Sequence, residues 1–151
     1  MIDPFCSAVD TGKTQFYGTS HFMVLYNIRP IAAGHSLFVP VRHVERITEL
    51  TDKEAKDLNR VMKKVIPVLI RFYGSEDNSY NLAVQSGPYS GRTIDHLHIH
   101  IIPRKPDDKY QKRGGGLKVD ISESLEDLGP EHVSAEIALL RKYFGYSYQK
   151  G

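Results

Sequence analysis

The stretch His96-Leu97-His98-Ile99-His100-Ile101-Ile102 alternates histidine with aliphatic residues for three periods and ends at Pro103. Strict alternation with a period of two is typical of a β-strand that has one face in a core. We therefore expect Leu97, Ile99 and Ile101 to point into the core. The three histidines should then form a row on the opposite face.

The histidine row has three interpretations, and the first two are weak. Seven histidines in 151 residues would seldom fall on three alternate positions by chance, which argues against a plain half-exposed strand. Imidazole is the commonest metal ligand, but side chains two apart on a strand are roughly 6.6 Å apart. Zinc needs its ligand nitrogens within about 2.1 Å. A metal site would need ligands from elsewhere, and the chain has one cysteine, Cys6.

Catalysis at phosphorus is the third interpretation. Histidine supplies a neutral nucleophile, a proton donor and a partner for phosphate oxygens in one residue type. Neighbouring imidazolium charges lower one another's pKa, so at least one ring should stay neutral and nucleophilic near neutral pH. The row therefore favours a phosphorus-centred reaction.

Length and composition are those of one globular domain. The chain has 151 residues, 40% of them hydrophobic and 25% charged, without a long apolar run or a signal-peptide pattern. The single Cys6 excludes an intramolecular disulfide, which fits a cytoplasmic and also a nuclear location. A net charge of +2 is too small to attract nucleic acid or a membrane broadly, so an anionic partner must be held by local groups.

The remaining elements follow from periodicity and capping. Thr51-Asp52-Lys53-Glu54 matches a capping box and precedes apolar residues at helical spacing, with Pro67 inside and Gly74 as the stop. A last helix should start near Ser134 and end at Gly145. Short alternating or apolar runs predict strands at 16–17, 22–26, 34–40 and 80–85.

The loop directly before the histidine row carries anion-binding chemistry. Ser86-Gly87-Pro88-Tyr89-Ser90-Gly91-Arg92-Thr93 contains two glycines, hydroxyls and an arginine. Such a loop brings backbone amides, a hydroxyl and a guanidinium close to an anion. Its position next to the histidines favours phosphate binding.

The motif His-φ-His-φ-His-φ-φ at 96–102, with φ hydrophobic, resembles that of the histidine triad (HIT) superfamily. Further matches point to its fragile histidine triad branch, the dinucleoside triphosphate hydrolases. They are Arg29-Pro30-x-x-x-Gly34-His35, the connection 42–49, Gln85-x-Gly87-x-x-x-Gly91-x-Thr93, Ile102-Pro103-Arg104-Lys105 and the closing Leu139-Leu140-Arg141-Lys142-Tyr143-Phe144.

The resemblance implies an α+β fold over residues 1–151. It has a five-stranded antiparallel sheet, one long helix and a C-terminal helix, and it pairs with a second copy into a ten-stranded sheet. Residues 106–133 are expected to be a mobile loop, and 146–151 a flexible tail. The implied activity is cleavage of diadenosine triphosphate to AMP and ADP, with magnesium or manganese accompanying the polyphosphate and no tightly bound metal.

The resemblance also assigns roles. His98 matches the nucleophile that forms a nucleotidyl-histidine, with its other ring nitrogen held by a carbonyl near His96. His100 would contact phosphate oxygens, and His96 and His35 would support the row. The substrate-binding positions would be Asn27 at the ribose and, at the phosphates, Gln85, Gly91, Arg92, Thr93 and Ile94.

Two departures and three alternatives stay open. Arg92 stands where the fragile histidine triad protein has glutamine, so the preferred phosphate chain length could differ. The expected substrate-proximal tyrosine cannot be placed after residue 107, where Tyr110 is a weak match. A purine nucleoside phosphoramidase or diadenosine tetraphosphate hydrolase of the same superfamily, a nucleotide-binding signalling module with slow turnover, and a structural metal protein are the alternatives.

Overall fold

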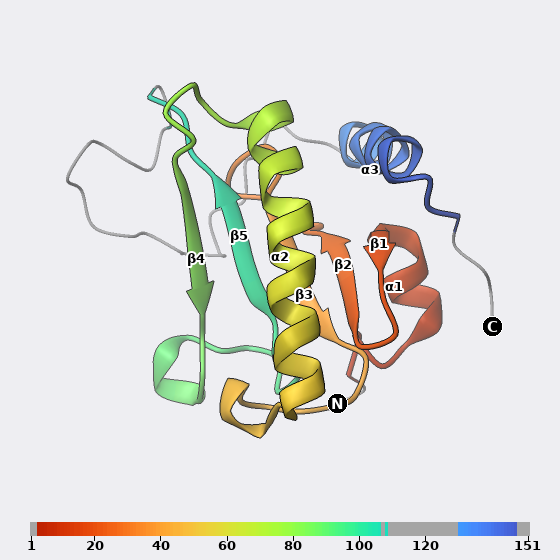
Figure 1. The fold of residues 1–151 in the computed structure, drawn as a ribbon, viewed down its shortest axis with the longest axis vertical. Coiled ribbons are helices and arrows are strands. Elements are labelled where there is room, and N and C mark those ends of the chain that lie inside the picture. Colours follow the sequence, from red (N-terminus) through yellow and green to blue (C-terminus); the bar gives the residue numbers. More distant parts are fainter. Residues whose placement is uncertain (1–2, 107, 109–129, 148–151) are drawn as a thin grey trace.

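A five-stranded antiparallel sheet forms the centre of the fold. The computed structural model describes residues 3–106, 108 and 130–147, and its strands run in the order β1-β2-β3-β5-β4 (Figure 1). This is the sheet expected from the sequence. The strands are β1 (Gln15–Gly18), β2 (Phe22–Tyr26), β3 (Ser36–Pro40), β4 (Tyr80–Val84) and β5 (Ile99–Pro103), and each neighbouring pair is antiparallel.

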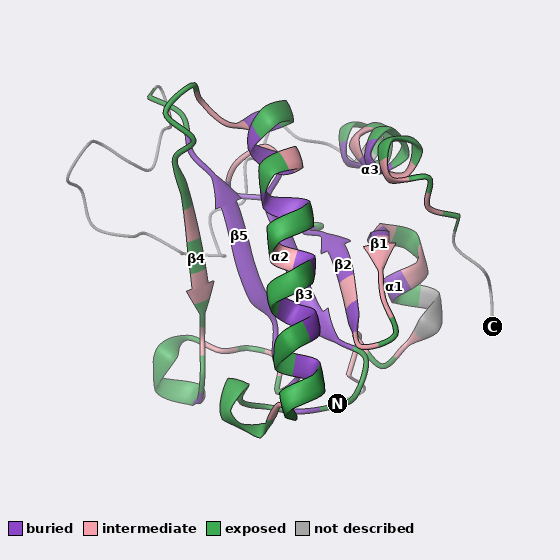
Figure 2. Cartoon of the chain, viewed as in Figure 1, coloured by how far each residue is buried: buried purple, intermediate pink, exposed green. Residues whose placement is uncertain are grey.

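The helix α2 (Asp52–Tyr73) lies across one face of the sheet (Figure 1). Figure 2 shows its buried stripe turned toward the strands and its exposed stripe turned outward. The other helices are α1 (Ala8–Thr14), α3 (Pro130–Phe144) and two short 3₁₀ turns, η1 (Ile47–Glu49) and η2 (Pro88–Ser90). No helix among the described residues is long and apolar enough to span a membrane.

The predicted limits of α2 are confirmed. The Thr51 hydroxyl accepts a hydrogen bond from the Glu54 N–H, and the Glu54 carboxylate accepts one from the Thr51 N–H at 2.8 Å. These two bonds satisfy amide groups that a helix start would leave unpaired. The helix continues through Pro67 and ends at Gly74, whose N–H donates to the carbonyl of Ile70.

The histidine strand is shorter than expected. It begins at Ile99 rather than at His96, and its first partners are Phe38 on β3 and Val84 on β4. Pro40 ends β3 and lacks an N–H, so no regular ladder can continue past it. Its carbonyl instead accepts a hydrogen bond from the His96 ring at 2.8 Å.

The predicted alternation still holds. Leu97, Ile99 and Ile101 belong to the main hydrophobic core beneath α2. The histidine face is covered as well, because His96, His98 and His100 are 0%, 5% and 1% exposed.

Two segments differ from the sequence-based expectation. Residues 3–14 carried no recognised pattern, yet they include α1, whose first turn is capped by the Ser7 side chain. The helix α3 begins at Pro130, so residues 130–133 are helical instead of loop. The rest of the expected mobile loop, with Tyr110, and most of the expected flexible tail lie outside the described residues.

Gly34 closes the connection that places His35. Its φ of +83° lies in the left-handed region, and an added Cβ would meet the Tyr73 ring at 2.5 Å. Its N–H donates to the Tyr26 hydroxyl at 2.9 Å. Glycine is therefore required here by both backbone conformation and space.

The substitution Gly34→Ala should lower the free energy of unfolding by about 2–4 kcal/mol, because left-handed strain adds to the clash with Tyr73. Gly145→Ala is the matched control, since Gly145 has φ +60° with no atom near the added Cβ. It should cost only about 1 kcal/mol. Chemical denaturation measures both, and equal losses would show that the Tyr73 contact contributes nothing.

Candidate active site

A cavity of about 260 Å³ opens on the sheet face opposite α2. The segment 3–7, which we call the N-terminal strap, forms one wall together with α1. The other walls come from β2, the connection after it and the segment before β5. The lining residues are Pro4, Phe5, Asp10, Thr11, Thr14, Leu25, Tyr26, Asn27, Ile28, Arg29, Leu37, Thr93, Ile94, His98 and His100.

His98 is held in one tautomer by its own backbone neighbourhood. Its Nδ1 lies 2.8 Å from the carbonyl oxygen of His96. A carbonyl oxygen can only accept, so Nδ1 carries the proton and Nε2 keeps its lone pair. The ring lines the cavity, which makes the His98 Nε2 an available nucleophile.

A chain of hydrogen bonds gives His100 the opposite arrangement. The Ile31 N–H donates to the His35 Nδ1 at 3.2 Å, so His35 carries its proton on Nε2. That nitrogen lies 2.9 Å from the His100 Nδ1 and donates to it. His100 must then be protonated on Nε2, a buried atom without a hydrogen-bond partner among the described residues. This N–H is a donor available to a ligand in the cavity.

Burial keeps these rings neutral. Removal from water is the largest cause that lowers the pKa of His98 below its ordinary value. Burial, followed by repulsion from His98, lowers the pKa of His100 to about 4. Burial is also the largest cause that lowers the pKa of His35 well below its ordinary value, followed by repulsion from the protonated form of His100 and from Arg104. These lowered pKa values leave His98, His100 and His35 uncharged near neutral pH, which agrees with the expectation that at least one ring of the row stays neutral.

Asn27 lies at the cavity beside His35. Its side-chain Nδ2 is 3.2 Å from the His35 Nε2, and its Oδ1 accepts a hydrogen bond from the Arg29 N–H. The amide is buried, and the hydrogen bond from the Arg29 N–H sets its orientation. Of the remaining predicted binding residues, Thr93 and Ile94 also line the cavity.

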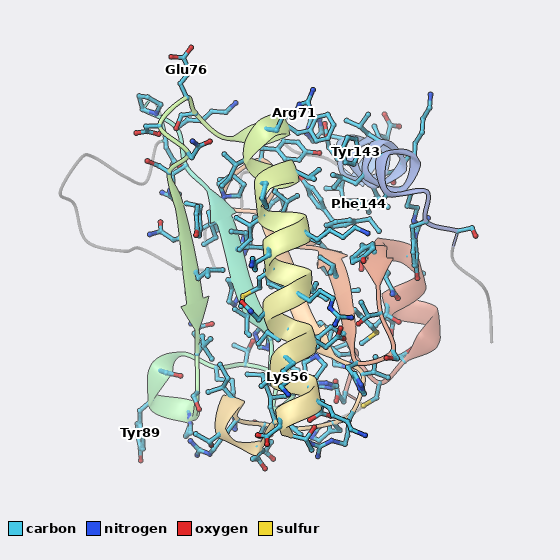
Figure 3. All side chains as sticks on the ribbon, viewed as in Figure 1. Lys56, Arg71, Glu76, Tyr89, Tyr143 and Phe144 are labelled. Carbon is cyan, nitrogen blue, oxygen red and sulfur yellow. The ribbon has the colours of Figure 1, made fainter. Side chains whose placement is uncertain are left out.

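Gln85, Gly91 and Arg92 lie in the adjoining loop and do not line the cavity. The Gln85 side chain donates to the Ser90 carbonyl, and Gly91 has φ +84° with the Gln85 Nε2 close to where a Cβ would lie. The loop carries η2, whose Tyr89 projects into solvent (Figure 3).

Arg92 is occupied by two carboxylates. It pairs with Asp95 at 2.7 Å and with Glu45 at 3.3 Å, and its side chain is only 8% exposed. The predicted phosphate loop is thus adjacent to the row, and its guanidinium is held next to the cavity by acidic neighbours.

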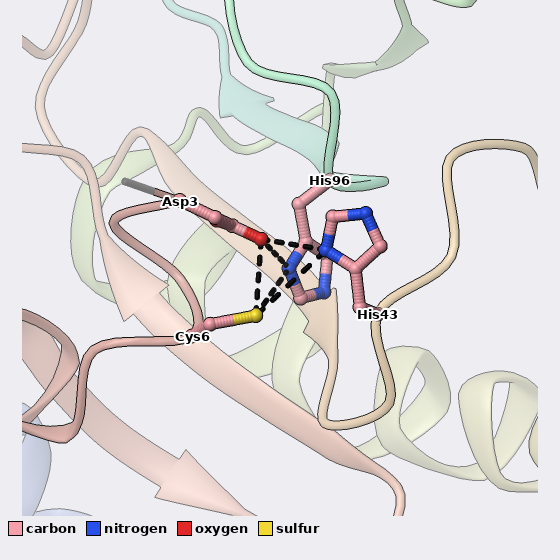
Figure 4. A group of neighbouring side chains, drawn as sticks. All are labelled: Asp3, Cys6, His43 and His96. Carbon is pink, nitrogen blue, oxygen red and sulfur yellow. Dashed lines mark hydrogen bonds and ion pairs between the residues drawn. The ribbon is translucent and has the colours of Figure 1, made fainter. Parts of the chain in front are cut away.

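His96 faces away from the cavity into a second group of side chains. Its Nδ1 lies 2.8 Å from the Asp3 Oδ2, and the same oxygen contacts the His43 Nδ1 at 2.7 Å and the Cys6 thiol at 3.0 Å (Figure 4). The ligand atoms of Asp3, Cys6, His43 and His96 lie within 4.8 Å of one another. We call these four residues the strap cluster.

Sequence reasoning missed the N-terminal part of the site. Phe5 approaches the His98 ring at a centroid distance of 5.4 Å, and α1 contributes three cavity residues. The available signal was Ser7-x-x-Asp10, which matches a helix start, and the structure has Ser7 as the cap of α1.

Comparison with known proteins agrees with this geometry. The HIT domain family matches residues 10–107. Among the relatives, the nitrilase and fragile histidine triad fusion protein NitFhit of Caenorhabditis elegans is 43% identical over 93 residues, which are 62% of this chain and 21% of that protein. An asymmetrical bis(5'-nucleosyl)-tetraphosphatase of Schizosaccharomyces pombe is 36% identical over 104 residues, 69% of this chain and 56% of the relative.

A relative of similar length and a solved structure extend the match. A bis(5'-adenosyl)-triphosphatase of Dictyostelium discoideum is 31% identical over 129 residues, covering 85% of this chain and 84% of that protein. The crystal structure of NitFhit superposes with a TM-score of 0.66 at 33% identity, over 86% of this chain and 27% of that one. This chain spans about half, or less, of the length of the first two relatives.

The family match covers all five strands and the whole histidine row, and a relative of nearly the same length is similar along most of the chain. The chain therefore belongs to the HIT domain family.

Proposed function

We propose that this protein hydrolyses dinucleoside polyphosphates, with diadenosine triphosphate cleaved to AMP and ADP. The observation that carries the proposal is the pairing of tautomers at the cavity. His98 offers a lone pair on Nε2, and His100 offers an N–H on its own Nε2. The names of the relatives from Dictyostelium discoideum and Schizosaccharomyces pombe support a substrate of this class.

The reaction consists of two displacements at the α-phosphorus. The His98 Nε2 forms a bond to phosphorus while the bond from phosphorus to the oxygen of ADP breaks, and ADP leaves with that electron pair. The positive charge then carried by the His98 ring is stabilised through its Nδ1–H by the carbonyl of His96. Water attacks the same phosphorus, its proton is lost to solvent, and AMP leaves as the bond to His98 breaks.

The other residues of the site bind the substrate and orient its phosphates, ribose and base. The His100 N–H donates to a phosphate oxygen, and His35 holds the His100 ring in the tautomer that allows this. Asn27 lies where a ribose would enter, beside Leu25 and Leu37, which offer an apolar wall to a base. Magnesium or manganese accompanies the polyphosphate, held mainly by phosphate oxygens and water. The reducing cytoplasm or nucleus suits a chain with one free thiol, Cys6.

The preferred chain length depends on Arg92. Its guanidinium is shared by Asp95 and Glu45, and the next residue along the chain, Thr93, lines the cavity. A phosphate beyond the first two could replace these carboxylates and gain a charge-assisted hydrogen bond. This observation favours diadenosine tetraphosphate as the second candidate substrate.

Replacing the nucleophile tests the mechanism. His98→Asn should lower kcat for diadenosine triphosphate by at least about 10³-fold, because no other lone pair takes its place. AMP affinity should change little, as measured by titration calorimetry. His21→Asn, outside the cavity, is the control and should keep full activity. Retained turnover in the His98 variant would remove this ring from the chemistry.

Replacing Arg92 tests substrate choice. Arg92→Gln should raise KM for diadenosine tetraphosphate about tenfold relative to diadenosine triphosphate, because a charge-assisted contact is lost. Arg46→Gln is the matched control, since Arg46 contacts Ser86 of the same loop from an exposed position. An equal change for both substrates would assign Arg92 a purely structural role.

We also propose that two copies pair through the edge strand β4 into a ten-stranded sheet. Within the described part of the chain β4 pairs only with β5, and its Tyr80, Leu82 and Val84 are about two-fifths exposed on the α2 side of the sheet. An edge strand with exposed apolar residues is a template for another strand. A homodimer would cover this strip.

A charge placed on this strip should separate the copies. Leu82→Lys is expected to weaken dimerisation at least about tenfold, because a lysine would be buried without a partner. Sedimentation equilibrium measures the change, and Leu139→Lys on α3, equally exposed, is the control. If the Leu82 variant stays dimeric, the interface lies elsewhere.

A further inference from the structure

The cavity has a phosphate end and a far end. His100 on β5 pairs with Leu37 on β3, and Leu37 pairs in turn with Leu25 on β2. Residues paired in this way share one face of the sheet, and neighbouring strands lie about 4.8 Å apart. Leu25 is therefore about 10 Å from His100 across the sheet, and β1 lies one strand further. A nucleotide whose phosphorus meets His98 extends its ribose and base toward β2 and α1.

The far end is lined by α1 and by the connection after β2. Five lining residues come from these two segments: Asp10, Thr11, Thr14, Ile28 and Arg29. Leu25 and Leu37 lie between them and the histidines, so a flat base would rest on apolar side chains there. Among the described residues that line the cavity, Asp10 and Arg29 are the only two that carry a charge at neutral pH.

Both charged groups are open to a ligand. The Asp10 side chain is 55% exposed, and its ion pair with Lys13 is long, at 3.9 Å. An exposed pair of this kind contributes little. Arg29 is exposed as well, and its guanidinium has no ion pair or hydrogen bond with any residue that the structure describes. One carboxylate and one guanidinium at the far end thus lack a strong partner of their own.

Guanine fits this pair of charges better than adenine does. Guanine presents two donors, N1–H and the N2 amino group, on one edge and two acceptors, O6 and N7, on another. A carboxylate takes the first edge with two parallel hydrogen bonds, and a guanidinium takes the second. Adenine has a lone pair on N1 and an amino group in place of O6. Each charged side chain would therefore meet one mismatched atom of adenine.

We propose that Asp10 and Arg29 make the cavity selective for guanosine, so that the nucleotide transferred to His98 is preferentially GMP. The inference rests on the proposed function and names the base beside the attacked phosphorus. Asp10 accepts from N1–H and the N2 amino group, and Arg29 donates to O6 and N7. Adenosine keeps the apolar contacts with Leu25 and Leu37, so it is still cleaved, about tenfold less efficiently. The displacements at phosphorus are unchanged, with GMP in place of AMP.

A mixed dinucleotide reports this preference directly. Adenosine and guanosine joined by a 5'-5' triphosphate can bind in two orientations, which give either GMP and ADP or AMP and GDP. The ratio of these products equals the ratio of kcat/KM for the two orientations, so it does not depend on how much of the protein is active. With magnesium, the full chain should release GMP in about tenfold excess over AMP, measured chromatographically at low conversion. Equal amounts of GMP and AMP would overturn the proposal.

Two variants assign the preference to its residues. Asp10→Asn and Arg29→Gln should each reduce the excess of GMP to about threefold or less, because one set of paired hydrogen bonds is lost. Asp52→Asn is the matched control, since Asp52 begins α2 on the other face of the sheet and is exposed, and it should keep the ratio of wild type. A poorly folded variant would lose both products alike. If Asp10 binds the ribose, which both nucleotides share, its variant would keep the ratio, and the assignment would be wrong.

Binding without turnover separates this inference from the proposed function. Calorimetry should show GMP binding to the full chain about tenfold more tightly than AMP, and Asp10→Asn should remove most of the difference. If no dinucleotide is hydrolysed but GMP is still preferred, the proposed function is wrong and the base selectivity stands. If dinucleotides are hydrolysed but GMP and AMP bind equally, the base selectivity is wrong and the proposed function stands.

Discussion

The hydrogen bond from the His98 Nδ1 to the carbonyl of His96 is the contact on which the site depends. It spans two residues, so the backbone just before β5 sets it whatever occupies the cavity. It converts a ring with two interchangeable nitrogens into one with a fixed lone pair. Burial then keeps that lone pair free of a proton by lowering the pKa of His98. Nucleophilic character is thus a property of the fold and needs no adjacent general base.

His35 and His100 are also fixed in one tautomer each, but here the group presented to the cavity is an N–H instead of a lone pair. A backbone N–H at Ile31 decides the state of His35, and His35 decides the state of His100. Two neighbouring rings therefore present different groups to one cavity, a lone pair and an N–H. The sheet supports this division, because β5 lies between β3 and β4 and its residues are buried on both faces. His100 is thus held by a rigid strand, and His98 and His35 directly precede β5 and β3.

Much of this was predictable from the sequence, and the missed parts have physical reasons. The capping box at Thr51 and the alternation at 96–102 act locally, so α2 and the core side of β5 followed from spacing alone. The start of β5 did not, because it depends on where Pro40 interrupts a strand distant in sequence. The strap and α1 were missed because a seven-residue helix is too short to show a period. The strap residue Asp3 contacts His96, which lies 93 residues away along the chain.

That separation has a consequence for assembly of the molecule. The contact between Asp3 and His96 closes a loop of chain that contains β1 to β4. Contacts between residues so far apart in sequence form late in folding. During synthesis the strap leaves the ribosome well before His96, one of the residues on which it docks. A wall held by such distant contacts can form after the sheet and detach without unfolding it. A protein built in this way can complete its rigid framework before it gains the compartment in which its chemistry takes place.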